Sequence, residues 1–374
     1  MPPPAPPPGP PAAPSGLPAP TLGASPSAAQ LDQRVAHLAA HALAAASKKS
    51  ASVAARNFQR FCALYHVRVH PSRGLSDEDL ARYIAWITAD GSVKSASTVS
   101  NYVSMGVRRL HRDMGLPWPR LSDRPLVADV LQGTRRLLKA TTGTAQKLPV
   151  TVEMLRRFRP LLNLGDSADL CIWTALLTGF YGLLRKANLA APTAGKRAKA
   201  PDTTVCPTGV LSRSSIETRE GRLWLVLRDT KTIQLGQRVL RLPLPVIPGD
   251  ALCPTAALRL FLAATASRPA SSQLFGFLGT SGHWCDLTHA VLVSRIKALV
   301  AALGLDPARY AGHSLRRGGA TFAFSKANLH PQLIKALGDW LSSAFMRYCE
   351  AQEGMRIAGA NAMAAATLAS APTA

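Results

Sequence analysis

The apolar residues of this chain change from helical to alternating spacing in one short region, and this change limits the folds open to the chain. Residues 222–228 and 238–244 alternate apolar and polar side chains, which is the spacing of half-buried β-strands. Residues 229–232 lie between them, so the two stretches are expected to pair as an antiparallel hairpin. Elsewhere from residue 31 onward the spacing is largely helical. The sequence therefore predicts a mainly α protein with a small antiparallel β-sheet, an α+β fold.

The first 30 residues have a different composition from the rest. Twelve of the 29 prolines precede Ala28, and no charged residue precedes Asp32. Such a segment favours extended polyproline conformations and cannot bury a core. We expect residues 1–30 to be a disordered Pro/Ala-rich tail, which is either inert or docks to a proline-recognition domain.

Residues 31–142 are expected to form a helical domain. Ser76 begins a capping box, and Thr98 is the expected cap of a later helix over 98–114. That helix and the next, over 126–139, each combine an apolar face with basic residues elsewhere. These basic residues are Arg108, Arg109, Arg112, Arg135, Arg136 and Lys139. Two such helices suit a bundle that lies on phosphate groups, although charges that are simply solvated give the same pattern.

A second domain is predicted over residues 151–350, after a linker at 143–150 that has no apolar period. Its most apolar helix is expected over 169–189, with Arg185 at its end. Further helices are expected over 254–265, 287–303, 314–326, 330–337 and 342–350. The Ala-rich residues 351–374 are expected to form a C-terminal helix or tail.

The charge of the chain narrows the classes of partner. Lysine and arginine number 44 against 21 acidic residues, which gives a formal net charge of +23. This excess points to a polyanion, namely DNA, RNA or an anionic membrane surface. No apolar stretch reaches the ~18 residues that span a bilayer, and no signal peptide is recognisable. The six cysteines form no CxxC pair, which favours free thiols over disulfides or a zinc site.

The stretch 311–319, AGHSLRRGG, is the most informative motif. It places His313 three residues before Arg316 at the start of a helix, so both lie on one face. The backbone N–H groups and partial positive charge of a helix N-terminus favour a phosphate there. Alone, the motif is a weak signal, because a single histidine is more often structural. Arg185 and Lys231 precede it, and Gly-Asp-Trp340 and Tyr348 follow it.

The order Arg, Lys in a β-turn, His-x-x-Arg, Gly-x-Trp and Tyr resembles the tyrosine recombinase family, which includes phage integrases and Cre- and Xer-like enzymes. The words HSLRRGGATFAF and GDWLSSAFMRY are most similar to recombinases of eukaryotic mobile elements. The resemblance covers roughly residues 151–350. It implies an integrase-type catalytic domain, and the helical domain before it fits the family's SAM-like core-binding domain.

The resemblance implies a reaction in which Tyr348 attacks a phosphodiester and forms a covalent 3′-phosphotyrosine link. Lys231 would protonate the leaving 5′-oxygen. Rejoining would need no ATP, because the link conserves the energy of the bond. The resemblance implies neither a metal ion nor another cofactor.

The same resemblance assigns the groups around the phosphate. Arg185 and Arg316 would hold its non-bridging oxygens, which a guanidinium matches in geometry. His313 would bond the same phosphate and help to move the tyrosine proton. Trp340 would donate its indole N–H to an oxygen. Arg317 would contact DNA or solvent.

Two departures from the family accompany the match. Asn188 stands where the family often has a carboxylate three residues after the first Arg, and the interval from Trp340 to Tyr348 is one residue shorter than in many bacterial members. The resemblance implies double-stranded DNA as the partner, a homotetramer on paired sites, and a nuclear location, or a cytoplasmic one in a prokaryote. Two alternatives remain open: a monomeric type IB-like topoisomerase, and a domesticated DNA-binding protein that no longer cuts.

Overall fold

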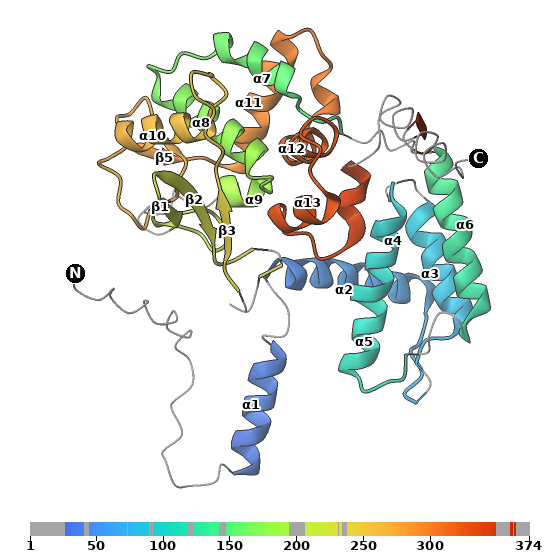
Figure 1. The fold of residues 1–374 in the computed structure, drawn as a ribbon. Coiled ribbons are helices and arrows are strands. Elements are labelled where there is room, and N and C mark those ends of the chain that lie inside the picture. The colour runs from blue at the N-terminus through green and yellow to red at the C-terminus, as the bar shows by residue number, and fades with distance from the viewer. Residues whose placement is uncertain are drawn as a thin grey trace, which may run out of the picture. The chain divides into compact units, whose positions relative to one another are not determined.

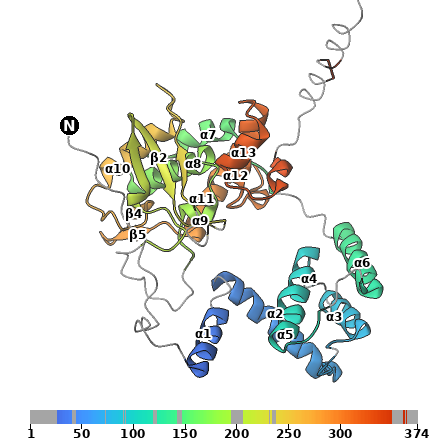
Figure 2. The same ribbon diagram turned by 60° about the horizontal axis from the view of Figure 1, so that its bottom comes forward.

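The computed structural model describes residues 27–40, 45–72, 74–89, 91, 93–118, 123–141, 147–193, 206–230, 232–233, 238–348, 360–361 and 363. The chain forms two compact units, Met1–Thr144 and Ala145–Ala374. Most of the described elements are helices, and a small antiparallel sheet of three strands and a separate antiparallel pair of strands accompany them (Figures 1 and 2). The predicted α+β class with a small antiparallel sheet is therefore confirmed.

The regular elements described in the first unit are all helices. Its elements are α1 (Ala28–Ala40), α2 (Ala45–Tyr65), α3 (Asp77–Ala89), α4 (Ala96–Tyr102), the π-helical η1 (Val103–Val107), α5 (Arg108–Asp113) and α6 (Pro125–Thr141). The core forms around the aromatic rings of Phe58, Phe61 and Tyr83, all of which are buried. The rings of Phe58 and Tyr83 meet edge to face with centroids 5.1 Å apart, a favourable geometry for aromatic pairs.

The helix expected over 98–114 is longer than predicted and contains a π-turn. It begins at Ala96, and its cap is Ser95, whose hydroxyl accepts from the N–H of Thr98 at 3.2 Å. The prediction of Thr98 as the cap is therefore wrong, because a serine three residues earlier satisfies the free N–H group. Gly106 in the π-turn lies against α2, since a Cβ there would be 2.8 Å from the carbonyl oxygen of Ala54.

The second unit surrounds one very apolar helix. Its helices are α7 (Val152–Phe158), η3 (Arg159–Leu161), α8 (Ser167–Tyr181), α9 (Lys186–Leu189), η4 (Arg213–Ser215), α10 (Pro254–Ala264), α11 (His289–Ala302), η5 (Pro307–Arg309), α12 (Ser314–Ser325), α13 (Pro331–Leu337) and η6 (Ser343–Tyr348). The side chains of α8 from Leu170 to Phe180 are all buried. Both α10 and α12 pack on this helix, which explains why it is apolar on every side.

The sheet has the order β1-β2-β3 and is antiparallel, with β1 at Ile216–Arg219, β2 at Arg222–Leu227 and β3 at Leu240–Pro243. Leu225 pairs with Leu242 across β2 and β3, which confirms the predicted hairpin. The sequence did not indicate β1, which has four residues, or the separate pair β4 (Gly276–Leu278) and β5 (Trp284–Asp286). Strands this short contain too few residues for a period of two to stand out.

The prediction of one continuous helix over 169–189 is wrong after Tyr181. Helix α8 ends at Tyr181, and Leu183 has a left-handed backbone with φ +49°. The N–H of Leu184 bonds the carbonyl of Gly179, and the N–H of Leu183 bonds that of Phe180. This pattern is a Schellman helix end, which usually has glycine at the left-handed position. Arg185 therefore lies in a turn between α8 and α9.

Candidate functional site

The turn after α8 directs Arg185 toward the residues that follow α13. Its Nη2 donates to the backbone carbonyl of Asp339 at 3.0 Å, and its Nη1 lies 3.5 Å from the carboxylate of the same residue. The Arg185 side chain keeps 18% of its surface exposed. A charged fork that is held on one side and reaches solvent on the other can bind an anion without large rearrangement.

Arg316 joins the same two turns from α12. Its Nη1 donates to the carbonyl of Leu183 at 2.6 Å, and its Nη2 to that of Gly338 at 2.5 Å. Its guanidinium carbon lies 3.7 Å from the centre of the Trp340 ring, a distance typical of a cation–π contact. Arg316 is buried. The structure thus brings Arg185, Arg316 and Trp340 together.

His313 lies directly before α12 and is exposed. Its neighbour Gly312 packs on the residue that follows Arg185, because a Cβ at Gly312 would lie 2.5 Å from the Cδ of Lys186. The start of α12 therefore runs beside the turn that carries Arg185. The hydrogen bond of His313 to a phosphate remains a prediction.

A buried carboxylate that the sequence did not single out lies among these groups. Asp339 accepts hydrogen bonds from the hydroxyl of Thr230 at 2.8 Å, from the hydroxyl of Thr232, and from the guanidinium of Arg238. Burial alone would raise the pKa of Asp339, but these hydrogen bonds outweigh burial and hold its pKa below the ordinary value. The carboxylate is therefore ionised at neutral pH.

Lys231 lies outside the described residues. Its two neighbours Thr230 and Thr232 both donate to Asp339, and their hydroxyls lie 2.9 Å apart. Backbone bonds between Thr230 and Ile233, at 3.1 and 3.3 Å, close the turn. The residues on either side of Lys231 are thus attached to the carboxylate that also contacts Arg185.

Tyr348 ends a 3-10 helix, η6 (Ser343–Tyr348), where an α-helix over 342–350 was expected. The predicted helix is thus present as a 3-10 helix in the described part of this segment, and the phenol of Tyr348 belongs to the side chains that are not described. Phe345 of the same turn packs on Trp340 with ring centroids 5.8 Å apart. It also joins a small core with Leu183 and Ile334, which links this turn to the end of α8.

Asn188 bonds backbone groups. Its amide oxygen accepts from the N–H of Arg185 at 3.3 Å, and its amide nitrogen donates to the carbonyl of Gly209 at 2.9 Å. The first bond caps the short helix α9. The carboxylate partner of the Arg185 guanidinium is therefore Asp339.

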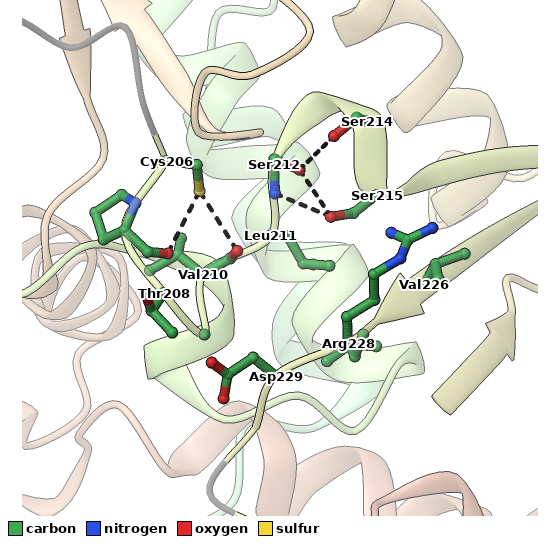
Figure 3. Close-up of a pocket in the computed structure, with 13 residues that line it drawn as sticks. Cys206, Thr208, Val210, Leu211, Ser212, Ser214, Ser215, Val226, Arg228 and Asp229 are labelled. Atoms are coloured by element: carbon green, nitrogen blue, oxygen red, sulfur yellow. Dashed lines mark hydrogen bonds between the residues drawn. The ribbon is translucent and has the colours of Figure 1, made fainter. Parts of the chain in front are cut away.

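A pocket of about 270 Å³ lies beside the end of β2. In the view of Figure 3, Cys206 and three serines lie along its upper edge and Asp229 lies below them. Burial raises the pKa of the Cys206 thiol to about 11 and also raises the pKa of Asp229. None of the six predicted catalytic residues lines this pocket. Its lining holds hydroxyls, the Cys206 thiol, the Asp229 carboxylate and a single cation, Arg228, so it has no cluster of cations for a phosphate.

Four of the six predicted basic residues of the first unit line two grooves, which share Ser104, Arg108 and Trp118. One, of about 480 Å³, also includes Arg135. The other, of about 450 Å³, also includes Arg109 and Arg112. The sequence did not point to the tryptophan, since it follows the end of the periodic helix. The Trp118 ring itself packs within the unit, since the guanidinium carbon of Arg124 lies 5.0 Å from its centre and the His111 ring meets it edge to face.

Three of the predicted DNA contacts have a different setting. Arg136 is exposed on α6 but lines neither groove. The Lys139 side chain is outside the described residues. Arg317 donates from Nη1 to the carbonyl of Lys147 at 2.7 Å, which ties α12 to the start of its unit.

Within the described residues, no group of histidine, cysteine or acidic side chains has the arrangement of a metal site. The five cysteines in that part of the chain are free thiols. A search of the same residues finds no helix with the length and apolar character needed to cross a bilayer.

Comparisons with known proteins give a fold. No protein-family model matches the sequence, and no curated protein sequence matches it. A structure of lambda integrase, residues 75–356, as a dimer bound to a COC′ core site is 13% identical with a TM-score of 0.52, over 86% of this chain and 95% of that one.

The Tn1549 transposon integrase in complex with transposon right-end DNA is 14% identical with a TM-score of 0.50, over 89% of this chain and 98% of that chain. The chain therefore has the fold of DNA integrases and site-specific recombinases. The resemblance to the tyrosine recombinase family is thus confirmed at the level of fold.

Proposed function

We propose that this chain is a site-specific DNA recombinase that cuts and rejoins DNA through a covalent 3′-phosphotyrosine intermediate. The observation that carries the proposal is the meeting of Arg185, Arg316 and Trp340 at the turn after α13. These residues lie far apart in the sequence, and a purely structural role does not require two arginines beside one tryptophan. The fold shared with DNA-bound integrases supports the same reaction class.

The chemistry follows from the charge that develops on phosphorus. The Tyr348 oxygen attacks the phosphodiester and produces a five-coordinate centre with two negative charges. Arg185 and Arg316 stabilise this charge with fixed guanidinium groups, which stay charged at working pH. His313 bonds the same phosphate and accepts the phenolic proton. The free phenol has a pKa of about 10, so the cations must favour the phenolate.

The leaving group is the 5′-oxygen of the cut strand. As its bond to phosphorus breaks, it takes a proton from the Lys231 ammonium and becomes a 5′-hydroxyl. Trp340 donates its indole N–H to a phosphate oxygen, while its ring face covers Arg316. Rejoining reverses these steps with a 5′-hydroxyl from another strand, so the reaction consumes no nucleotide cofactor.

The first unit supplies the sequence-independent grip on the duplex. Its two arginine-lined grooves place Arg108 and Arg135 beside Trp118, which suits contacts to phosphates and sugars. Each protomer would hold one duplex site. By the resemblance to recombinases of mobile elements, the protein acts in the nucleus as a homotetramer on paired sites, and its Pro-rich tail is available to proline-recognition domains.

A nicked suicide duplex tests the nucleophile. Duplexes of random sequence each carry one nick. When the protein cleaves next to the nick, the short fragment with the 5′-hydroxyl diffuses away and the covalent adduct accumulates. We expect the wild-type chain to form an adduct that resists denaturant, and Tyr348→Phe to abolish it while DNA binding is retained. Tyr181→Phe and Tyr310→Phe, which remove other phenols of the same unit, should keep the adduct.

An adduct that survives Tyr348→Phe would refute the assigned nucleophile. Binding by the wild-type chain without any adduct would favour a DNA-binding protein that no longer cuts. Joining of two duplexes by the pure protein separates a recombinase from a topoisomerase that relaxes one duplex as a monomer.

A further inference from the structure

The Asp339 carboxylate requires an explanation, because it adds negative charge where the proposed reaction needs positive charge. Its side chain is only 3% exposed. Burying a carboxylate is costly unless it is paired and hydrogen-bonded. A buried carboxylate at this turn is therefore expected to have a role, which a polar residue at the surface would not need.

The backbone at Asp339 gives a second, independent observation. Its φ is +55°. The N–H of Asp339 bonds the carbonyl of Ala336, and the N–H of Trp340 bonds that of Lys335. This is a Schellman end in which glycine is the usual residue at the left-handed position. Glycine would relieve the backbone here, so the chain carries the aspartate at the expense of local stability.

The donors to Asp339 come from both ends of the connection between β2 and β3. Thr230 and Thr232 lie at the first end, and Arg238 lies just before β3 at the second end. Arg185 approaches the same carboxylate from the turn after α8. One buried group thus joins Thr230, Thr232 and Arg238 to Arg185.

The residue where the family often has a carboxylate performs a different task here. Asn188 uses its amide to cap α9 and to hold Gly209. Without a charge at that position, the Arg185 guanidinium needs another acceptor. Asp339 provides it from an element far along the chain, together with Arg238, a cation that the sequence analysis did not single out.

We propose that Asp339 is a positioning residue that holds Thr230 and Thr232, the two neighbours of Lys231, against Arg185, so that protonation of the leaving 5′-oxygen depends on this carboxylate. The inference rests on the proposed strand-cleavage function. Asp339 does not touch the phosphate. It acts through the threonines on either side of Lys231, and two arginines offset its charge.

The test compares two leaving atoms. Suicide duplexes are built on captured target sites, one with the natural 5′-oxygen and one with sulfur in its place at the cut phosphodiester. A thiol has a pKa of about 8.5, so the sulfur leaves as a thiolate and needs no proton from Lys231. Single-turnover rates of adduct formation are measured at saturating protein.

With the oxygen substrate, we expect Asp339→Asn to slow cleavage by about 10–100-fold, which is less than the roughly 10²–10⁴-fold of general acid catalysis because the lysine itself is kept. With the sulfur substrate, the loss should shrink to less than about threefold. Lys231→Ala should show the same pattern, and the double variant should be no slower than Lys231→Ala alone. Asp250→Asn, which removes a carboxylate paired with Arg156 elsewhere in the unit, should cleave both substrates at the wild-type rate.

Equal losses on the two substrates would overturn the inference, because they would indicate general damage to the site. An Asp339→Asn variant as fast as wild type on oxygen would also overturn it. If that variant fails to fold, Asp339→Gly tests the same point in a backbone that favours glycine. Absence of any adduct with the wild-type chain would instead reject the proposed function.

Discussion

At the scale of single residues, the site depends on two left-handed positions, Leu183 and Asp339. Each lies at the end of a helix. Arg316 donates to a backbone carbonyl at both helix ends, that of Leu183 and that of Gly338. The motif order predicted which arginines and which tryptophan meet. It did not predict Asp339. A polar residue after a glycine is typical of an ordinary helix end, and the four donors to Asp339 come from segments far away in the sequence.

The ionisation of Asp339 gives a prediction about acid stability. Its folded-state pKa lies below the ordinary value of 3.8, so the unfolded chain binds a proton more readily than the folded one. The resulting stabilisation is fully present above that value and is lost as the pH falls below it, through the folded pKa. We expect Asp339→Asn to lack this contribution.

The measurement is urea unfolding of both proteins between pH 2.5 and 6, a range chosen about the ordinary carboxyl value. The difference in unfolding free energy should be constant above about pH 5 and should shrink toward acid. A difference that grows as the pH falls would contradict the assignment of a depressed pKa.

At the scale of elements, the glycines after the two arginines of the motif decide how closely α12 approaches its neighbours. A Cβ at Gly319 would lie 2.0 Å from the carbonyl oxygen of Phe180 on α8, and one at Gly318 would lie 1.8 Å from that of Val150. Both obstacles are backbone atoms, which cannot rotate away. Close contact of α12 with α8 places Arg316 within reach of Leu183.

Gly319→Ala should therefore destabilise the second unit and displace Arg316. We expect a loss of about 1–3 kcal/mol in unfolding free energy, as for other overpacked sites, with reduced cleavage. Gly133→Ala on α6 is the control, since no atom lies within 4 Å of a Cβ there. That change should be neutral or should stabilise by up to about 1 kcal/mol. Equal effects of the two changes would contradict the packing argument.

The secondary structure was predictable wherever local periodicity determines it. The hairpin of β2 and β3 and the helices α10 to α13 lie close to their expected ranges. The break between α8 and α9 was not, because its left-handed residue is a buried leucine. Nothing in the sequence around Leu183 indicates a turn that only the surrounding core stabilises.

At the scale of the whole molecule, the charge of +23 determines how binding responds to salt. Each phosphate contact releases counterions, and the logarithm of the affinity falls with the logarithm of salt by about 0.9 per contact. The grooves of the first unit contribute to this slope independently of the cleavage site. Replacing the arginines of these grooves should therefore weaken DNA binding without altering the cleavage of bound DNA.

The double variant Arg108→Ala/Arg135→Ala isolates that contribution, because both residues line one groove. We expect the salt slope of duplex binding to decrease by about 2, with similar losses on target and random DNA. Cleavage at saturating protein should stay at the wild-type rate, since neither arginine belongs to the second unit.

The control is Arg82→Ala on α3. The guanidinium of Arg82 pairs with Asp79, and Arg82 lines neither groove. Titrations by fluorescence anisotropy at several salt concentrations measure the slopes, and an unchanged slope in the double variant would place the DNA on another surface of the first unit.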